Sequence, residues 1–251
     1  MPHAINIATS TLASTLRSWR GLKASKICTQ PELDIILFDR EGCSDCRFVR
    51  EALTELNLNV MIAPCPDNGK NINKLEKESG SSRVPRLFDP NTETNLTGSN
   101  EIVEYLFSEY RGGEAPSQLK PSLINSTASK LASLVRFKAG VYAKPSRPAK
   151  QALTLFSFES SPFSRPVREL LCELELPYLL VNLGKQQWSD MGPANFRFTF
   201  KPYRPLKNTK RDDFFKKHGN VQVPFLKDPN TNVELFESED ILKYLKKSYG
   251  S

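Results

Sequence analysis

Two cysteines separated by two residues are the first group in the chain that could do chemistry. Cys43 and Cys46 lie in "EGCSDCRFVREAL", residues 41–53, and an apolar pattern with helical spacing starts directly after the first of them. A helix N-terminus offers unpaired backbone N–H groups and the positive end of the helix dipole, which together lower a thiol pKa from ~8.5 to ~3.5–7.5. We therefore expect Cys43 to be the nucleophile and Cys46 to resolve the mixed disulfide that it forms.

The charges beside the dithiol are expected to act in opposite directions. Asp45, between the cysteines, is expected to raise the pKa of the Cys43 thiol, whereas Arg40 and Arg47 are expected to lower it. A zinc half-site is less favoured, because the sequence has no second Cys-x-x-Cys pair and two histidines in total. We predict no bound metal.

A second copy of this segment occurs 118 residues later, with serine at both cysteine positions. "SSPFSRPVRELL" places Ser161 and Ser164 there. Two further blocks recur in the same order, "VPRLFDPNTET" as "VPFLKDPNTNV" and "GSNEIVEYLFSEY" as "ESEDILKYLKKSY". Such internal similarity predicts two homologous domains in tandem. We place them at residues 1–119 and 120–251, with an insertion near 186–207.

An N-terminal segment recurs as well. The first 30 residues contain no Asp or Glu and are rich in Ser and Thr, a composition typical of an organelle transit peptide. However, "NIATSTLASTLRSWRGLKAS" recurs as "NSTASKLASLVRFKAGVYAK" at 125–144, which favours a structural element of each repeat. The spacing predicts an amphipathic helix before each core, with an apolar face of Leu12, Leu16, Trp19, Leu131, Leu134 and Val135. Packing on the neighbouring domain is favoured over docking on a membrane surface.

Each core is predicted to run strand, helix, strand, helix, two strands and helix. In the first repeat we expect strands at 33–38, 60–63 and 85–88, helices at 44–57 and 70–79, and a hairpin at the "DPNT" turn. The first helix is expected to bury Phe48, Val49, Leu53 and Leu56. A closing helix with Ser99 as its N-cap is expected to bury Ile102, Val103, Leu106 and Tyr110.

This order, with Cys-x-x-Cys at the first helix and Val-Pro before the third strand, resembles the thioredoxin fold. More narrowly it resembles glutaredoxins and the N-terminal domain of glutathione transferases, and the whole chain resembles tandem glutaredoxin-like proteins. The implied fold class is α/β, with two tandem thioredoxin-like domains. The resemblance implies that Val84–Pro85 is a cis peptide and that the Val84 backbone pairs with the cysteinyl part of glutathione. It also implies that Ser99, at its helix start, receives the γ-glutamyl carboxylate.

The second repeat resembles serine-type glutathione transferases. "SPFS" places Ser161 where a serine hydroxyl hydrogen-bonds the glutathione thiolate in that family. The rest of the glutathione site implied by the resemblance is matched by Val223, Pro224, Glu237 and Ser238. Many relatives keep a cysteine where this chain has Ser164, so we expect no redox role for this repeat. We recognise no segment in residues 1–251 like the all-helical domain that supplies most of the electrophile pocket in glutathione transferases, and therefore expect transfer to be less favoured.

Three functions are consistent with these residues. The favoured one is a glutathione-linked thiol–disulfide oxidoreductase in which Cys43 and Cys46 react and repeat 2 binds glutathione or serves as a scaffold. Its partners would be glutathione and a protein or small molecule that contains a disulfide or is glutathionylated. The alternatives are a non-catalytic module that binds glutathione or a protein, and transfer of glutathione to an electrophile at Ser161.

The insertion is aromatic and basic. Phe196, Phe198 and Phe200 alternate with polar residues, and this period-two pattern predicts three rings on one face. Packing on the protein's own core, or closure as a lid, is favoured over stacking with nucleic acid.

The charge is distributed unevenly along the chain. Residues 1–119 carry 13 Lys and Arg against 16 Asp and Glu, a balance of −3, whereas residues 120–251 carry 22 against 12, a balance of +10. The basic half fits an anionic ligand or acidic partner, or a solvated lysine-rich surface.

The composition limits the cellular setting. Five cysteines, of which Cys28, Cys65 and Cys172 have no evident sequence partner, do not suggest a disulfide framework and favour a reducing compartment. We expect the cytoplasm, with the plastid stroma as the alternative. No run approaches the ~18 apolar residues of a membrane span. Pairing of the two domains within one chain and pairing between two copies in a homodimer both remain open.

Overall fold

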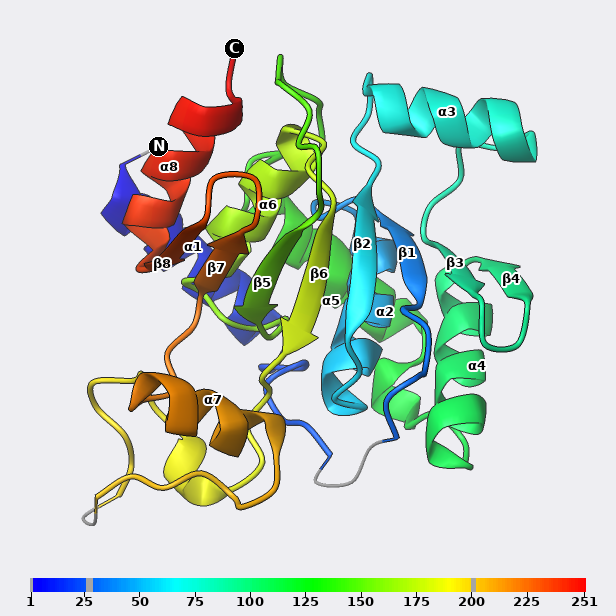
Figure 1. The fold of residues 1–251 in the computed structure, drawn as a ribbon. Helices are drawn as coiled ribbons and strands as arrows, with labels where there is room; N and C mark the ends of the chain where they lie inside the picture. The colour runs from blue at the N-terminus through cyan, green and yellow to red at the C-terminus, as the bar shows by residue number, and fades with distance from the viewer. Residues whose placement is uncertain (1, 26–28, 200–201) are drawn as a thin grey trace.

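A single sheet runs through both repeats of the protein in a computed structural model, which describes residues 2–25, 29–199 and 202–251. Its strand order is β4-β3-β1-β2-β6-β5-β7-β8 (Figure 1). The strands of repeat 1 are β1 (Ile36–Asp39), β2 (Val60–Pro64), β3 (Arg86–Asp89) and β4 (Thr94–Thr97). Those of repeat 2 are β5 (Leu153–Ser157), β6 (Tyr178–Asn182), β7 (Phe225–Asp228) and β8 (Val233–Phe236).

The two repeats are joined edge to edge. Within each repeat the first two strands are parallel and the remaining pairs are antiparallel. Across the junction β2 and β6 are antiparallel, with Val60 opposite Leu180 and Ile62 opposite Tyr178. Each repeat thereby covers one edge of the other, and an exposed strand edge is a common cause of unwanted association. The two domains therefore pair within one chain.

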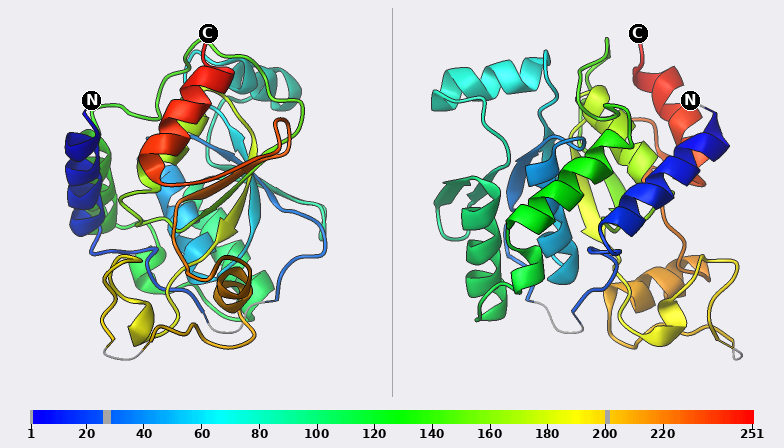
Figure 2. Two further views of the ribbon diagram at one scale, coloured as in Figure 1. Left: turned by 60° about the vertical axis from the view of Figure 1, so that its left-hand side comes forward. Right: turned by 180° about the vertical axis from the view of Figure 1, so that it is seen from behind.

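Eight α-helices are found in the described residues. They are α1 (His3–Leu16), α2 (Ser44–Glu55), α3 (Lys70–Ser79), α4 (Ser99–Arg111), α5 (Leu123–Leu134), α6 (Arg165–Glu173), α7 (Lys210–His218) and α8 (Ser238–Tyr249). Short 3₁₀ turns occur at η1 (Ser117–Leu119) and η2 (Trp188–Asp190). Helices α2, α4, α6 and α8 lie on one face of the sheet, α1 and α5 pack on the outer side of α6 and α2, and α3 and α7 lie at opposite ends of the molecule (Figures 1 and 2). Two thioredoxin-like domains in tandem are thus confirmed.

The buried faces of the repeat 1 helices are largely as predicted. Phe48, Val49, Leu53 and Leu56 of α2, and Ile102, Val103 and Leu106 of α4, are buried. Tyr110 is half-buried instead, and its hydroxyl donates a hydrogen bond to Asp89. Tyr249 and Asp228 form the equivalent bond in repeat 2, so each closing helix is fixed to its hairpin in the same way.

The helices before each core cross over to the other repeat. Helices α1 and α5 pack side by side, and α1 also contacts α6 while α5 contacts α2 (Figure 2). The expectation that they pack on the neighbouring domain is confirmed, but the predicted inward face is wrong. Small and polar residues are buried instead, namely Ser10, Ala13 and Ser14 of α1 and Asn125, Ser129 and Ala132 of α5.

Most leucines of these helices point to solvent, although Leu16 is half-buried. Leu12, Leu131 and Leu134 are 48%, 45% and 69% exposed, and α1 ends before Trp19. The physical reason is that small side chains let two helices approach closely, so the packed stripe follows serine and alanine rather than leucine. None of the described helices is both long enough and apolar enough to cross a membrane.

The insertion lies between β6 and α7. Apart from η2, its described residues form neither helix nor strand. Phe196 and Phe198 are 68% and 51% exposed, with ring centroids 6.3 Å apart, and Phe200 lies outside the described residues, as does Cys28. The prediction that the rings pack on the core is therefore wrong for Phe196 and Phe198, and Phe198 lines a pocket instead.

Candidate functional site

The dithiol lies at the N-terminus of α2. Cys43 is the N-cap residue and is half-buried, whereas Cys46, one turn further on, is buried. The Cys46 thiol donates a hydrogen bond to the Cys43 sulfur, and this bond, helped by the backbone N–H groups of Cys46 and Asp45, outweighs burial and lowers the pKa of Cys43 from 9.0 to about 6. Burial, and then the same bond to Cys43, raises the pKa of Cys46 well above its usual value. Repeat 1 therefore has one ionised thiol and one protonated thiol near pH 7.

The neighbouring charges affect this pKa less than the hydrogen bonds do. Asp45 raises the pKa of Cys43, in the predicted direction. That Arg40 and Arg47 lower it stays a prediction, and both arginines also have partners of their own. Arg40 pairs with Asp67 at 2.6 Å, and buried Arg47 donates to Ser133 at 2.9 Å.

Beside the dithiol lies a small cleft of about 260 Å³. Its lining includes Asp45, Val84, Pro85 and Ser99, so the structure brings the predicted glutathione residues of repeat 1 together next to the dithiol helix. The predicted cis peptide at Val84–Pro85 is confirmed. Ser99 is the first residue of α4 rather than its N-cap, a position that Gly98 takes with φ +109°.

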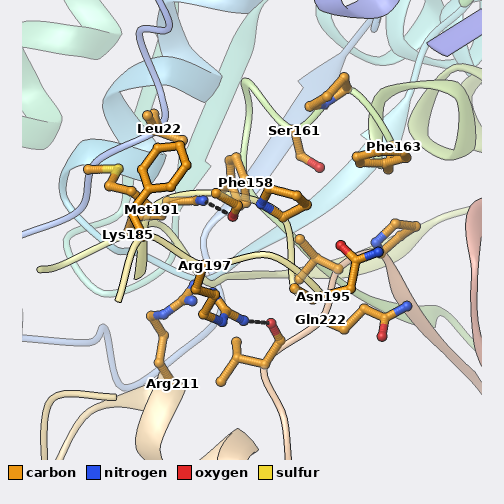
Figure 3. Close-up of a pocket in the computed structure, with 18 of the residues that line it drawn as sticks. Leu22, Phe158, Ser161, Phe163, Lys185, Met191, Asn195, Arg197, Arg211 and Gln222 are labelled. Atoms are coloured by element: carbon orange, nitrogen blue, oxygen red, sulfur yellow. Dashed lines mark hydrogen bonds between the residues drawn. The ribbon is translucent and has the colours of Figure 1, made fainter. Parts of the chain in front are cut away.

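The five glutathione-binding residues predicted in repeat 2 line one larger pocket. The pocket measures about 680 Å³, and its lining includes Ser161, Val223, Pro224, Glu237 and Ser238 (Figure 3). The Val223–Pro224 peptide is cis, as in repeat 1. Sites that bury most of a small ligand typically have volumes of ~300–1,000 Å³.

Ser161 is held in place by Ser164. The Ser161 hydroxyl oxygen accepts hydrogen bonds from the Ser164 hydroxyl at 2.9 Å and from the Ser164 N–H at 3.2 Å. Because the oxygen acts as acceptor in both bonds, its own O–H can donate to a ligand in the pocket. The serine at the second cysteine position thus orients the serine at the first.

Glu237 has a strained backbone. It adopts φ 62° and ψ 119° where repeat 1 uses Gly98, and its carboxylate accepts a hydrogen bond from Gln222 at 2.5 Å. A non-glycine residue in such a conformation costs ~1–3 kcal/mol, and strain of this kind is concentrated at functional sites. The pocket therefore retains a carboxylate at a position where glycine would be easier to accommodate.

Sequence reasoning missed the other half of this pocket. The insertion and α7 contribute Trp188, Met191, Phe198, Arg197 and Arg211, and the segment after α1 contributes Trp19 and Leu22. Lys185 also lines the pocket, and its backbone pairs with this segment through Lys185 N–H to Leu22 at 2.8 Å and Ala24 N–H to Lys185 at 2.9 Å. The basic and aromatic composition of the insertion was the signal in the sequence that could have indicated these pocket residues.

A buried ion network lies behind both sites. Arg50 of α2 and Arg168 of α6 each contact Glu41 and Glu159, with shortest distances of 3.0–3.3 Å. Glu41 directly precedes the Gly42–Cys43 pair, and Glu159 occupies the equivalent position in repeat 2. The network therefore connects the two candidate sites across the pseudo-symmetric junction. No group of described residues is placed to hold a metal ion.

Two strand–helix–strand–helix–hairpin–helix units, each with a cis proline and a candidate site at its first helix, define a tandem thioredoxin-like protein. The family model of the glutathione S-transferase N-terminal domain matches residues 37–114 and again 155–251. The chain belongs to this family and contains its domain twice. No curated protein and no solved structure matches the chain. The family indicates a glutathione-related function of a thioredoxin fold.

Proposed function

We propose that repeat 1 catalyses glutathione-linked thiol–disulfide exchange in a reducing compartment, the cytoplasm or the plastid stroma. The observation that carries this proposal is the asymmetry of the dithiol. Cys43 is half-buried at a helix N-terminus with a pKa of about 6, whereas Cys46 is buried and protonated. A nucleophile and a resolving thiol require this difference.

The reaction balances with glutathione as the reductant. The Cys43 thiolate attacks one sulfur of a substrate disulfide, the S–S bond breaks, and the leaving thiolate takes a proton from solvent. Cys46 then loses its proton and attacks Cys43, which releases the second substrate thiol and leaves a Cys43–Cys46 disulfide. Two glutathione molecules reduce this disulfide and leave as glutathione disulfide.

A glutathione redox titration, read by intact mass, tests the proposal together with a reductase assay. We expect reversible loss of two protons at a potential near the ~−200 to −230 mV of glutaredoxins. Cys43→Ser should abolish activity, and Cys46→Ser should trap glutathione on Cys43. Cys65→Ser is the matched control, because burial raises the pKa of Cys65 to about 12. Reductase activity that survives Cys43→Ser would show the proposal to be wrong.

A second candidate function is glutathione binding by repeat 2, either alone or for transfer to an electrophile. The observation that favours it is the single pocket that collects Ser161, Val223, Pro224, Glu237 and Ser238. Calorimetric titration of glutathione into a protein carrying Cys43→Ser and Cys46→Ser would isolate this site from thiol exchange. Absence of binding there would rule it out, and turnover with an electrophile would distinguish transfer from binding.

A further inference from the structure

The outward sides of helices α1 and α5 expose large apolar side chains. Helix α1 exposes no charged residue, only Ala4, Ile5, Ala8, Leu12 and Thr15. Helix α5 exposes one charge among Leu123, Ile124, Thr127, Lys130, Leu131 and Leu134. The outward side of a surface helix is ordinarily polar and charged. These two helices are therefore inverted, with small and polar residues buried and leucines exposed.

The two helices present these side chains as one surface. Arg136, shortly after α5, donates to the carbonyl of Asn6 in α1 at 2.8 Å, and Arg17, directly after α1, donates to the carbonyl of Asn125 in α5 at 2.9 Å. The helices are therefore antiparallel and side by side, at the surface of the molecule (Figure 2). We call their outward side the outer face and define it by six side chains that are 45–90% exposed: Ile5, Leu12, Leu123, Ile124, Leu131 and Leu134.

The charge around the outer face is positive. Residues 1–31 and 115–158, which contain both helices and the segments next to them, have 4 and 7 Lys and Arg respectively and no Asp or Glu. Lys130 lies among the leucines of the outer face and is exposed. Glu239 of α8 lies at one edge, near the start of α1, and is already paired with Lys243 at 2.9 Å. The outer face therefore complements a negatively charged partner.

Apolar surface and positive charge together indicate the kind of partner. A large exposed apolar patch on a folded protein marks an interaction surface for a protein or a membrane. If a second copy of the chain covered the outer face, the two Lys130 side chains would enter an apolar interface to which the outer face contributes no carboxylate, and unpaired like charges disfavour such a contact. A bilayer with anionic lipids offers both an apolar layer for the leucines and a negative surface for the lysines.

Both candidate sites lie next to this pair of helices. The Ser129 hydroxyl of α5 donates at 2.8 Å to the carbonyl of Ser44, the residue between the two cysteines that follows the first. The Ser14 hydroxyl of α1 donates at 2.9 Å to the carbonyl of Ser160, which directly precedes Ser161. A surface that binds α1 and α5 would therefore hold both sites close to itself.

We propose that the outer face of α1 and α5 docks the protein on the surface of a membrane that contains anionic lipids. The leucines and isoleucines enter the boundary between headgroups and acyl chains, and Lys130 lies at the lipid phosphates. Docking adds a location to the proposed thiol exchange. It does not depend on the chemistry of either site, because no residue of the outer face lines the cleft or the pocket.

Flotation of the full chain with lipid vesicles tests this docking. We expect binding to vesicles of two parts phosphatidylcholine and one part phosphatidylglycerol to be roughly tenfold tighter than binding to phosphatidylcholine alone. Leu134→Gln and, on the other helix, Leu12→Gln should each weaken binding to the mixed vesicles about tenfold, because one leucine no longer enters the bilayer. Lys130→Gln should weaken binding to the mixed vesicles about fivefold and leave binding to phosphatidylcholine unchanged.

Leu33→Gln is the matched control for the leucine variants. Leu33 is 56% exposed, and its backbone is hydrogen-bonded to Asn91 in the turn between β3 and β4 rather than to either helix. Its substitution should leave binding to both kinds of vesicle unchanged. Thermal melting of each variant excludes loss of fold as the cause of weaker binding, and the side chain of Leu134, 69% exposed, contributes little to the packed core.

Four outcomes would overturn the inference. Three of them concern lipid: no flotation with the mixed vesicles, equal affinity for both kinds of vesicle, and mixed-vesicle affinity that is unchanged in both Leu134→Gln and Leu12→Gln. The fourth is a dimer of the wild-type chain in sedimentation velocity that Leu134→Gln abolishes, because a second copy would then cover the outer face.

Discussion

The two copies of the site have the same backbone and different chemistry. In both, a cis Val-Pro peptide and the start of a closing helix lie beside the first helix of the repeat. In repeat 1 Asp45, rather than either cysteine, lines a cleft of about 260 Å³, whereas in repeat 2 Ser161 itself lines a pocket of about 680 Å³. A few substitutions and one insertion therefore separate a small cleft beside a dithiol from a larger pocket lined by a serine.

The start of the first helix explains part of this difference. Helix α2 begins directly after Cys43, and the Cys46 thiol with the N–H groups of Cys46 and Asp45 lowers the pKa of the Cys43 thiol. Helix α6 begins only at Arg165, and the Ser161 oxygen accepts from the hydroxyl and the N–H of Ser164, the residue equivalent to Cys46. In both repeats the second position of the motif therefore acts on the first, and the difference is that a thiol with a lowered pKa ionises near pH 7 whereas a hydroxyl stays protonated.

The largest effect on stability is expected from removing a carboxylate of the buried ion network that the two repeats share. Burial alone would raise the pKa of Glu159, but the charges of Arg168, Arg50, Arg165 and Arg47 hold it well below its usual range. Glu159→Gln should destabilise the protein by about 3–5 kcal/mol at pH 7, because it leaves buried arginines without their partner. The equivalent change, Glu41→Gln, should cost less, because Glu41 pairs with two arginines. Urea denaturation measures both.

The pH dependence of the stability loss tests whether the charge of Glu159 is its cause. A carboxylate with a depressed folded pKa contributes stability above its unfolded pKa of about 4.5 and loses it as pH falls toward the folded value. The gap between wild type and Glu159→Gln should therefore narrow at pH 3, and a gap of equal size at both pH values would contradict this account. Glu234→Gln, which removes an exposed pair with Lys227 at 2.8 Å, should cost less than ~1 kcal/mol.

A smaller effect tests whether the hydroxyl of repeat 2 binds the ligand. In a protein lacking the dithiol, Ser161→Ala should lower glutathione affinity about tenfold, since a hydrogen bond to a charged group contributes ~1.5–3 kcal/mol and tenfold corresponds to ~1.4 kcal/mol. Isothermal titration calorimetry measures the affinity. Ser108→Ala, on the exposed surface of α4, is the control. Unchanged glutathione affinity in Ser161→Ala would show that the Ser161 hydroxyl does not bind glutathione.

The sequence was sufficient to predict features that lie within one repeat. The duplication follows from recurring blocks, the order of elements along each repeat and the buried face of α2 follow from local periodicity, and the cis Val84–Pro85 peptide follows from the family resemblance. Between the repeats, packing of α1 and α5 on the neighbouring domain was predicted, but the helices that they contact and the β2–β6 pairing were not, because neither leaves a local signal. The inward face of α1 was mispredicted because leucine spacing was weighed above the stripe of serine and alanine.

The repeat 2 pocket shows the same limit. Ser161 and Val223–Pro224 could be recognised from their motifs, whereas Lys185 and Arg211 are 26 residues apart and meet only when the insertion folds back. The alternation of Phe196 and Phe198 suggested rings on one face that pack on the core, but both rings are more than half exposed. Aromatic residues occur both in pocket walls and in protein cores, so the spacing of the phenylalanines could not show which of the two they belong to.

The smallest expected effect concerns the one charge within the dithiol motif. Asp45 stands where repeat 2 has Phe163, and its charge raises the pKa of Cys43 against the hydrogen bonds that lower it. Asp45→Asn should therefore lower that pKa by a few tenths of a pH unit, since an exposed charge contributes ~0.2–1 kcal/mol and 1.36 kcal/mol corresponds to about one unit. The rate of alkylation by iodoacetamide, which follows the thiolate, should have its midpoint at about pH 6 in the wild type and lower in the variant. Asp213→Asn, at an exposed position of α7, is the control and should leave the midpoint of the alkylation rate unchanged. A midpoint that rises in Asp45→Asn would contradict this role. A fall would show that Asp45 keeps the thiol pKa closer to ambient pH, where an attacking thiol is most effective.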